Sequence, residues 1–138
     1  MAHPAFDFEV ISPDGSELRE RVTSLRLQGR GGSFGILARH APMVAALDAG
    51  PLLIEREGGA REVFAAGDGF VEVADGKVRA LVDFLERKSE IDVARAEAAE
   101  KRARERLRKR TRDVDALRAE AALRRALARL SVVHSELD

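Results

Sequence analysis

The 138-residue chain predicts a two-domain α+β protein, with an all-β domain over residues 1–88 followed by an α-helical hairpin over residues 89–138. Three observations predict this division. All 11 glycines, all four prolines and all six phenylalanines precede residue 85. The remainder is mostly Ala, Arg, Glu and Leu, which are strong helix formers. Residues 89–138 hold 13 basic and 10 acidic side chains, a net charge of +3, and the neutral total leaves −3 for residues 1–88.

Short alternating segments predict the strands of the first domain. In "AFDFEVI", Phe6, Phe8 and Val10 recur at period two, which places them on one face of a strand. "RVTSLRLQ" at residues 21–28 alternates in a similar way. Further short strands are predicted at roughly residues 33–37, 51–57, 62–66, 69–73 and 77–85. Many short strands at close spacing favour a β-sandwich or a small barrel.

Turn signals separate these segments. "SPDG" at Ser12–Gly15 combines a proline whose φ is preset with a glycine that tolerates positive φ. "EGGA" at Glu57–Ala60 and "ADGK" at Ala74–Lys77 have the residues of tight hairpin turns. The first domain is therefore expected to be built largely from antiparallel hairpins.

The second domain is predicted to be two antiparallel helices. We expect Ser89 to cap the first helix, with Glu90 and Asp92 in its first turn, and Ile91, Ala94 and Ala98 to form its apolar stripe. A bend is expected near Arg110–Asp113. The expected stripe of the second helix is Val114, Leu117, Ala121, Leu123, Leu127 and Leu130. Because these stripes are thin, little apolar area would hold the hairpin shut, and it is expected to be able to open.

Four arginines are expected to meet when the hairpin folds about residue 112. Arg95 then lies opposite Arg129, and Arg102 lies near Arg125. Four guanidinium groups on one side repel one another, and Asp92 or Glu86 would relieve only part of that repulsion. A polyanion would make the arrangement favourable, because guanidinium binds phosphate through bidentate, charge-assisted hydrogen bonds. The pattern suggests a phosphate-bearing ligand, against the alternative of ordinary surface ion pairs.

Several chemistries are excluded or disfavoured. The chain has no cysteine, so disulfides, thiolate catalysis and cysteine-ligated zinc are impossible. "GRGGSFG" at residues 29–35 lacks the Gly-Lys-Ser/Thr ending of a phosphate-binding loop and is interpreted as a turn. The three histidines lie far apart in sequence, and no catalytic or metal-binding constellation stands out. No apolar run approaches the roughly 18 residues of a membrane span, and the N-terminal segment does not resemble a secretory signal, so a soluble intracellular chain is expected.

A basic run, "RARERLRKRTR" at residues 102–112, has two interpretations. It is either a solvated helix face or a surface that docks on an acidic partner. Nucleic-acid binding is disfavoured, because the helical half has no aromatic residue to stack on bases and the first half is acidic. The cations predicted to meet the acidic partner are Arg104, Arg106, Arg108, Lys109, Arg110 and Arg112.

Five stretches carry a resemblance to a known family. They are "SPDG", "GGSFGILARHAPMV", "GDGFVEV", "IDVARA" and "ALRRALARLSV". With them the chain resembles the epsilon subunit of bacterial F-type ATP synthases over essentially its full length. The resemblance implies a β-sandwich of about ten strands followed by an antiparallel two-helix hairpin. One departure is Ala38-Arg39, where the family commonly has Pro-Gly before the loop histidine; Arg39 must then adopt any positive φ that the glycine served.

The resemblance also implies a role and partners. The chain is expected to be a non-catalytic rotor subunit of a proton-translocating ATP synthase that binds the gamma subunit, the c-ring and the alpha and beta subunits. It would lie at the cytoplasmic face of the cell membrane as a peripheral protein, held there only through the complex. The helices would extend into the catalytic head and inhibit ATP hydrolysis, and the basic run would meet an acidic segment of a beta subunit.

ATP is the ligand that the resemblance implies. It would be a regulatory ligand, with or without magnesium, and no catalytic cofactor or metal is implied. The implied contacts are Glu86, Ile91, Asp92, Arg95, Ala96, Arg102, Arg125 and Arg129. Two other interpretations stay open: a purely structural coupling subunit that never binds nucleotide, and a β domain with a basic arm for nucleic acid.

Overall fold

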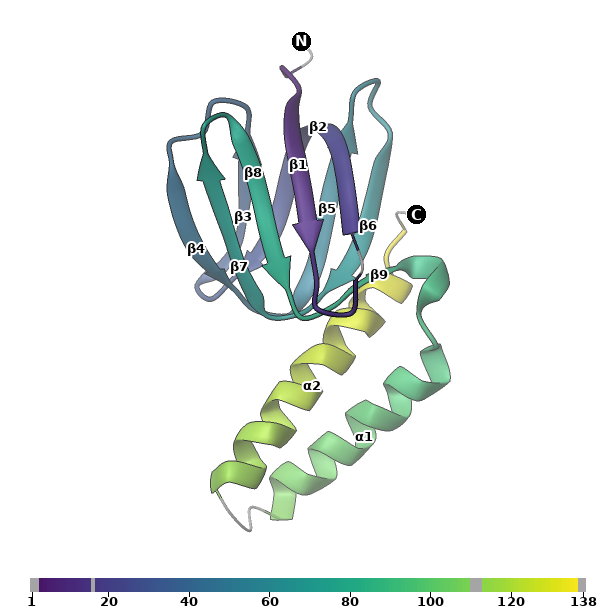
Figure 1. The fold of residues 1–138 in the computed structure, drawn as a ribbon. Coiled ribbons are helices and arrows are strands. Elements are labelled where there is room, and N and C mark those ends of the chain that lie inside the picture. Colours follow the sequence, from purple (N-terminus) through teal and green to yellow (C-terminus); the bar gives the residue numbers. More distant parts are fainter. Residues whose placement is uncertain (1–2, 16, 110–112, 137–138) are drawn as a thin grey trace.

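A computed structural model describes residues 3–15, 17–109 and 113–136 of the chain. A β-sandwich is joined at one end to a pair of antiparallel helices that project away from it (Figure 1). The predicted fold class is therefore confirmed, with nine strands in the described residues against the ten or so expected. The strands are β1 (Phe6–Ile11), β2 (Glu17–Gly29), β3 (Gly32–Leu37), β4 (Met43–Leu47), β5 (Gly50–Arg56), β6 (Arg61–Ala66), β7 (Gly69–Ala74), β8 (Lys77–Val82) and β9 (Leu85–Arg87).

The strands form two layers that share the long strand β2. One layer has the order β4-β7-β8-β1, and the other has the order β3-β2-β5-β6-β9. The first half of β2 pairs with β1, and its second half pairs with β3. A register shift between Val22 and Ser24 interrupts the pairing of β2 with β5, as expected where a strand bends from one layer to the other.

The core lies between the two layers. Phe6, Phe8 and Val10 of β1 all point into it and are at most 6% exposed, as the period-two pattern predicted. Facing strands contribute further β-branched and leucine side chains, such as Val22, Ile54 and Val71. Burial of these side chains supplies the main stabilisation of the first domain.

Two sequence expectations about strands are wrong. The chain from Lys77 to Leu85 is not one strand, because β8 ends at Val82 and β9 begins at Leu85 in the other layer. The backbone between them is held by Asp83 N donating to Asp68 O and by Gly67 N donating to Phe84 O, both at 2.9 Å. Strand β4 was not expected at all, since "MVAAL" has no clear alternation of apolar and polar residues.

The turns have the conformations that their residues favour. Asp75 and Gly76 take positive φ values of 53° and 74°, which is the geometry of a type I′ hairpin. Gly15 has φ 88°, and its N–H donates to the Ser12 carbonyl at 3.1 Å. Arg39 takes φ 65°, so this non-glycine residue adopts the left-handed conformation at the position where the resemblance implied a glycine.

The helical hairpin begins with a 3₁₀ turn, η1 (Lys88–Glu90), followed by α1 (Val93–Lys109) and α2 (Asp113–Val133). The expectation that Ser89 caps the first helix is wrong, because Ser89 lies inside the 3₁₀ turn and Ile91 is extended at φ −80°, ψ 124°. The predicted bend at Arg110–Asp113 falls mainly on residues 110–112, which lie outside the described residues; α1 ends and α2 begins on either side of them.

The expected apolar stripes of the helices are wrong in part, although Leu130 is buried as expected. Ala94 and Ala98 of α1 are exposed, and Ala96 and Ala103 are the buried residues. On α2, Leu117 and Leu127 are exposed, and the buried residues are Ala119, Ala126, Ala128, Leu130 and Val132. The physical reason is that α2 packs against α1 with one face and against β5 and β6 with another, so no single stripe describes it.

A second, smaller apolar cluster joins the two domains. Val132 of α2 is fully buried against Val63 and Ala65 on the outer face of β6, together with Phe84 and Ile91. The chain at the start of the hairpin is also anchored, because Arg87 Nη1 lies 2.6 Å from Glu62 Oε2 and its guanidinium lies 5.1 Å from the Phe64 ring centre. The hairpin is thus held to the sandwich at its base, where η1 begins and α2 ends near the C-terminus.

Gly69→Ala should strongly destabilise the sandwich. A Cβ at Gly69 would lie 1.8 Å from the carbonyl oxygen of Leu81, which is backbone of the paired strand and cannot move aside. We expect a loss of roughly 1–3 kcal/mol or more, measured by urea unfolding. Gly31→Ala is the matched control, because nothing lies within 4 Å of its added Cβ, and its effect should stay within about 0.5 kcal/mol. Equal unfolding midpoints for the two variants would contradict the close strand contact.

Candidate functional site

A cleft of about 440 Å³ lies where the two helices meet the end of the sandwich. This volume is within the roughly 300–1,000 Å³ range of small-molecule sites. The cleft is lined by Glu86 from β9, by Glu90 and Asp92 before α1, and by residues of both helices. The helix residues are Arg95, Ala96, Ala99 and Arg102 of α1, and Ala122, Arg125, Ala126 and Arg129 of α2.

The four arginines that were predicted to meet when the hairpin folds about residue 112 all line this cleft. Arg129 is the best anchored of them. Its Nε donates to Glu86 Oε1 at 2.6 Å and its Nη2 donates to Oε2 at 3.4 Å. The same guanidinium lies 4.1 Å from the centre of the Phe84 ring. Arg129 is therefore oriented by the sandwich, and Glu86 offsets its charge.

The other three guanidinium groups have no such direct partner, although the carboxylates of Glu90 and Asp92 also line the cleft. Among the residues that the structure describes, none forms an ion pair with Arg95, Arg102 or Arg125. Arg95 and Arg102 are exposed and Arg125 is half-buried, so water solvates all three in part. An anion placed among them would gain charge-assisted hydrogen bonds without displacing an internal partner.

The two other acidic residues of the cleft are used by the backbone. Asp92 Oδ1 accepts the Arg95 N–H at 3.0 Å, which is the N-cap bond of α1. Glu90 Oε1 accepts the Arg87 N–H at 2.8 Å. Because Glu86 is engaged by Arg129 as well, each acid of the cleft already has a partner on the chain. The spacing of Asp92 and Arg95 therefore marks a helix start rather than a surface ion pair.

Seven of the eight residues expected to contact ATP line the cleft. The exception is Ile91, which is 8% exposed and packs in the cluster of Phe84 and Val132 instead. Sequence reasoning did not identify Glu90, Ala99, Ala122 or Ala126 as part of this site. The alanines could have been identified from their spacing, because small residues at i, i+3 and i+4 positions on two facing helices leave space between the helices.

The basic run is only partly described. Arg104, Arg106, Arg108 and Lys109 are exposed on α1, whereas Arg110 and Arg112 lie outside the described residues. Arg104 is engaged by Glu100 of the same helix, with Arg104 Nη2 2.9 Å from Glu100 Oε2. Arg106, Arg108 and Lys109 are exposed and do not line the cleft, whereas Arg102 at the start of the run does.

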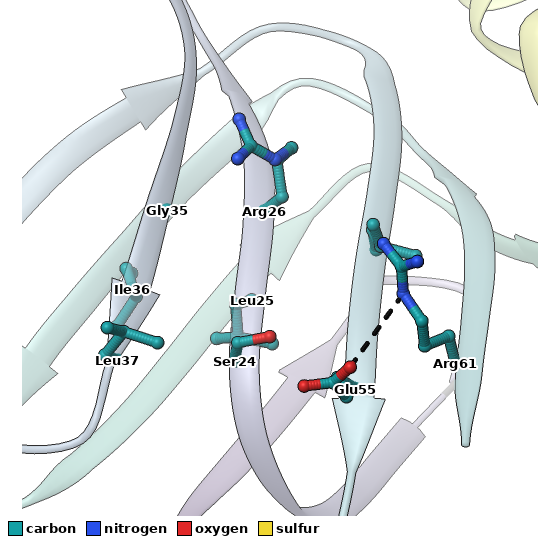
Figure 2. Close-up of a pocket in the computed structure, with 9 residues that line it drawn as sticks. Ser24, Leu25, Arg26, Gly35, Ile36, Leu37, Glu55 and Arg61 are labelled. Atoms are coloured by element: carbon teal, nitrogen blue, oxygen red, sulfur yellow. Dashed lines mark ion pairs between the residues drawn. The ribbon is translucent and has the colours of Figure 1, made fainter. Parts of the chain in front are cut away.

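A groove of about 350 Å³ on the outer face of β3, β2 and β5 has fewer charged groups that could bind a ligand (Figure 2). Its charged side chains are paired or hydrogen-bonded, since Arg61 Nε lies 4.0 Å from Glu55 Oε1 and Arg26 Nη1 lies 3.5 Å from Ser33 Oγ. A ligand in this groove would have to compete with these contacts. The cleft between the helices is therefore the better candidate for a binding site.

The described residues contain no group of three or more His, Asp or Glu side chains placed to hold a metal ion. None of the described helices is long and apolar enough to cross a membrane.

Comparison with known proteins first defines the class. Residues 5–88 match the family described as ATP synthase, Delta/Epsilon chain, beta-sandwich domain. Residues 89–134 match the family described as ATP synthase, Delta/Epsilon chain, long alpha-helix domain. A sandwich followed by a helical hairpin is thus the architecture of a delta or epsilon chain of an ATP synthase.

Individual relatives specify the chain further. It is 48% identical over 103 residues to an ATP synthase epsilon chain of Pelotomaculum thermopropionicum, covering 75% of this chain and 76% of the relative. It is 47% identical over 101 residues to an ATP synthase epsilon chain of Lawsonia intracellularis, covering 73% and 75%. The chain belongs to the epsilon-subunit family of bacterial F-type ATP synthases.

Solved structures agree with this fold. A chain in the cryo-EM structure of the Euglena gracilis mitochondrial ATP synthase, OSCP/F1/c-ring in rotational state 1, superposes with a TM-score of 0.81 at 25% identity. The match covers 96% of this chain and 84% of that chain. A chain of the Tetrahymena thermophila mitochondrial ATP synthase central stalk and c-ring gives a TM-score of 0.52 at 18% identity and supports the fold alone.

Proposed function

We propose that the chain is a non-catalytic central-stalk subunit whose helical hairpin binds ATP as a regulatory ligand and inhibits ATP hydrolysis when it opens. The observation that carries the ATP proposal is the cleft with three guanidinium groups that form no ion pair with a described residue. A triphosphate supplies anionic oxygens that match them. The small side chains of Ala99, Ala122 and Ala126 leave room beside these groups for the rest of the nucleotide.

We assign the site to binding alone. Its carboxylates hold the chain: Asp92 caps α1, Glu90 accepts the Arg87 N–H, and Glu86 pairs with Arg129. ATP that binds only the closed hairpin stabilises it by RT ln(1 + [L]/Kd), about 2.7 kcal/mol at a hundredfold excess over Kd. A free energy of this size can determine whether the closed or the open hairpin predominates, because the apolar cluster around Val132 that holds the hairpin closed is small.

Isothermal titration of the intact chain with ATP tests this proposal. We expect saturable binding at millimolar ATP or below, and a loss of at least about tenfold in affinity for Arg95→Gln combined with Arg125→Gln, since each removes a charged hydrogen-bond donor. Arg118→Gln is the matched control, because Arg118 is an exposed arginine of α2 that does not line the cleft. An absence of heat at millimolar ATP would remove the sensor and favour a purely structural coupling subunit.

The sandwich offers a docking surface for the rest of the stalk. Ala46, Phe70, Leu81 and Ile11 lie in register across β4, β7, β8 and β1 and form an apolar row on the outer face of that layer. Phe70 is 46% exposed and Leu81 is 36% exposed, and a hollow of about 370 Å³ lies beside them. An exposed aromatic flanked by aliphatic residues is typical of a protein interface. We assign this row to the gamma subunit.

Phe70→Ser should weaken assembly with the gamma subunit. We expect a loss of about tenfold or more in affinity, because buried aromatic residues dominate such contacts. The binding is measured between the intact chain and a purified gamma subunit. Leu37→Ser is a closely matched control, since Leu37 is 45% exposed but lies on β3 in the other layer. If Leu37→Ser weakened binding as much as Phe70→Ser did, the assignment to this row would be wrong.

The inhibitory state requires an extended arm. A continuous helix of about 42 residues would span about 63 Å at 1.5 Å per residue, which is long enough to reach a neighbouring subunit. Its exposed cations Arg106 and Arg108 would then meet an acidic surface of a beta subunit. In the hairpin these two residues are solvated, so docking would not require them to give up an ion pair with a described residue.

Neutralising that surface should relieve inhibition. In the reconstituted synthase we expect Arg106→Gln with Arg108→Gln to raise ATP hydrolysis at low ATP by about two- to fivefold, the effect of losing exposed ion pairs. Arg26→Gln with Arg118→Gln removes the same charge elsewhere and should leave hydrolysis unchanged. Hydrolysis rates that match for both double variants would argue against an inhibitory arm that uses this run.

A further inference from the structure

A second ion pair holds the hairpin to the sandwich on the side of α2 away from the cleft. Arg124 Nη2 lies 3.2 Å from Asp68 Oδ2, and neither residue lines the cleft. Asp68 belongs to the turn between β6 and β7, 56 residues earlier in the chain. We propose that the Arg124–Asp68 pair is a latch that keeps the hairpin docked whether or not the cleft holds a ligand. The proposal rests on the two-state hairpin described above.

The position of Arg124 on α2 supports this assignment. Arg124, Ala128 and Val132 follow one another at four-residue intervals and therefore lie on one face of the helix. Val132 is 0% exposed and Ala128 is 3% exposed, whereas Arg124 is exposed. The docked face thus runs outward from the buried Val132, and Arg124 makes its outermost polar contact. Because this contact is the farthest from Val132, it must break early when α2 separates from the sandwich.

Asp68 is held ready for this contact by the sandwich. Its Oδ1 accepts the Ala49 N–H at 2.7 Å, which leaves Oδ2 directed toward Arg124. The Asp68 side chain therefore gains little conformational freedom when the hairpin undocks, and it loses little conformational entropy when the hairpin docks again. Exposed ion pairs commonly fail to stabilise because both side chains must be ordered. Here one of the two is ordered already.

The same turn also supports the other end of the docked helix. A Cβ at Gly67 would lie 2.8 Å from Phe84 Cδ1, so glycine is needed for the Phe84 ring to pack against this turn. Arg129 in turn stacks on Phe84. Arg129 lines the cleft and would interact with any ligand there, but Arg124 does not. The latch and the cleft are consequently separable by mutation.

The rate at which a buried cysteine is alkylated measures undocking. The chain has no cysteine, so Ala128→Cys introduces a unique thiol on the docked face. In the intact, nucleotide-free chain we expect Arg124→Gln to accelerate alkylation of this thiol about two- to fivefold, the effect of losing one exposed ion pair. Asp68→Asn should have the same effect, because its side-chain oxygen can still accept the Ala49 N–H. Arg124→Lys keeps the charge and should stay near the parent rate.

Controls separate the latch from general loosening. Arg118→Gln should leave the alkylation rate unchanged, and Arg124→Gln with Asp68→Asn should be no faster than either single variant, since both remove one interaction. High salt should accelerate the parent chain by a larger factor than Arg124→Gln, because among the described residues the variant keeps only the Arg129–Glu86 pair between α2 and the sandwich. Backbone hydrogen exchange in α2 of the otherwise unmodified chain, without Ala128→Cys, should show the same order of variants.

The outcomes are distinct from those of the ATP titration. Equal alkylation and exchange rates for Arg124→Gln, Asp68→Asn and Arg118→Gln would overturn the latch, even if ATP binds. Accelerated rates for the first two variants would establish the latch, even if the parent chain binds no ATP and the proposed sensor fails.

Discussion

The packing of Val132 against the outer face of β6 is the contact on which the rest of the hairpin depends. Five buried residues form this cluster, and they come from β6, from Phe84 between β8 and β9, from Ile91 before α1 and from the end of α2. The cleft, the stacking of Arg129 on Phe84 and the Arg124–Asp68 pair all follow from α2 being seated there. Because the cluster is much smaller than the sandwich core, separating the two domains costs far less than unfolding the sandwich.

Charge on α2 is divided between two tasks. Arg125 and Arg129 face the cleft, and Arg124 faces the sandwich, although the three lie within two turns of one helix. Glu86 offsets Arg129, so the repulsion inside the cleft is smaller than four clustered guanidinium groups would imply. The cleft lining holds four arginines and three carboxylates, a net charge of +1, and Arg95, Arg102 and Arg125 are its arginines without an ion pair to a described residue. A closed hairpin is therefore electrostatically tolerable by itself, and an anion would add stability without being required for closure.

Prediction from sequence succeeded where the determining interactions are local. Alternation in "AFDFEVI" placed Phe6, Phe8 and Val10 in the core, and the residues of "ADGK" specified the hairpin turn. Prediction failed where a segment packs against two other parts of the structure at once. The stripe of α2 was misassigned because the helix packs on α1 and on the sandwich at once, and Ile91 was misplaced because a buried extended residue interrupts the helix before α1.

Local sequence information was sufficient for the division into a β half and a helical half, for the hairpin turns and for the set of arginines that an antiparallel hairpin brings together. These follow from periodicity, from propensity and from counting residues about a bend. Two contacts could be found only in the folded chain: Glu86 pairs with Arg129, and Arg124 reaches Asp68. These contacts join residues 43 and 56 positions apart. The register of such contacts is set by packing of whole domains, which no local pattern encodes.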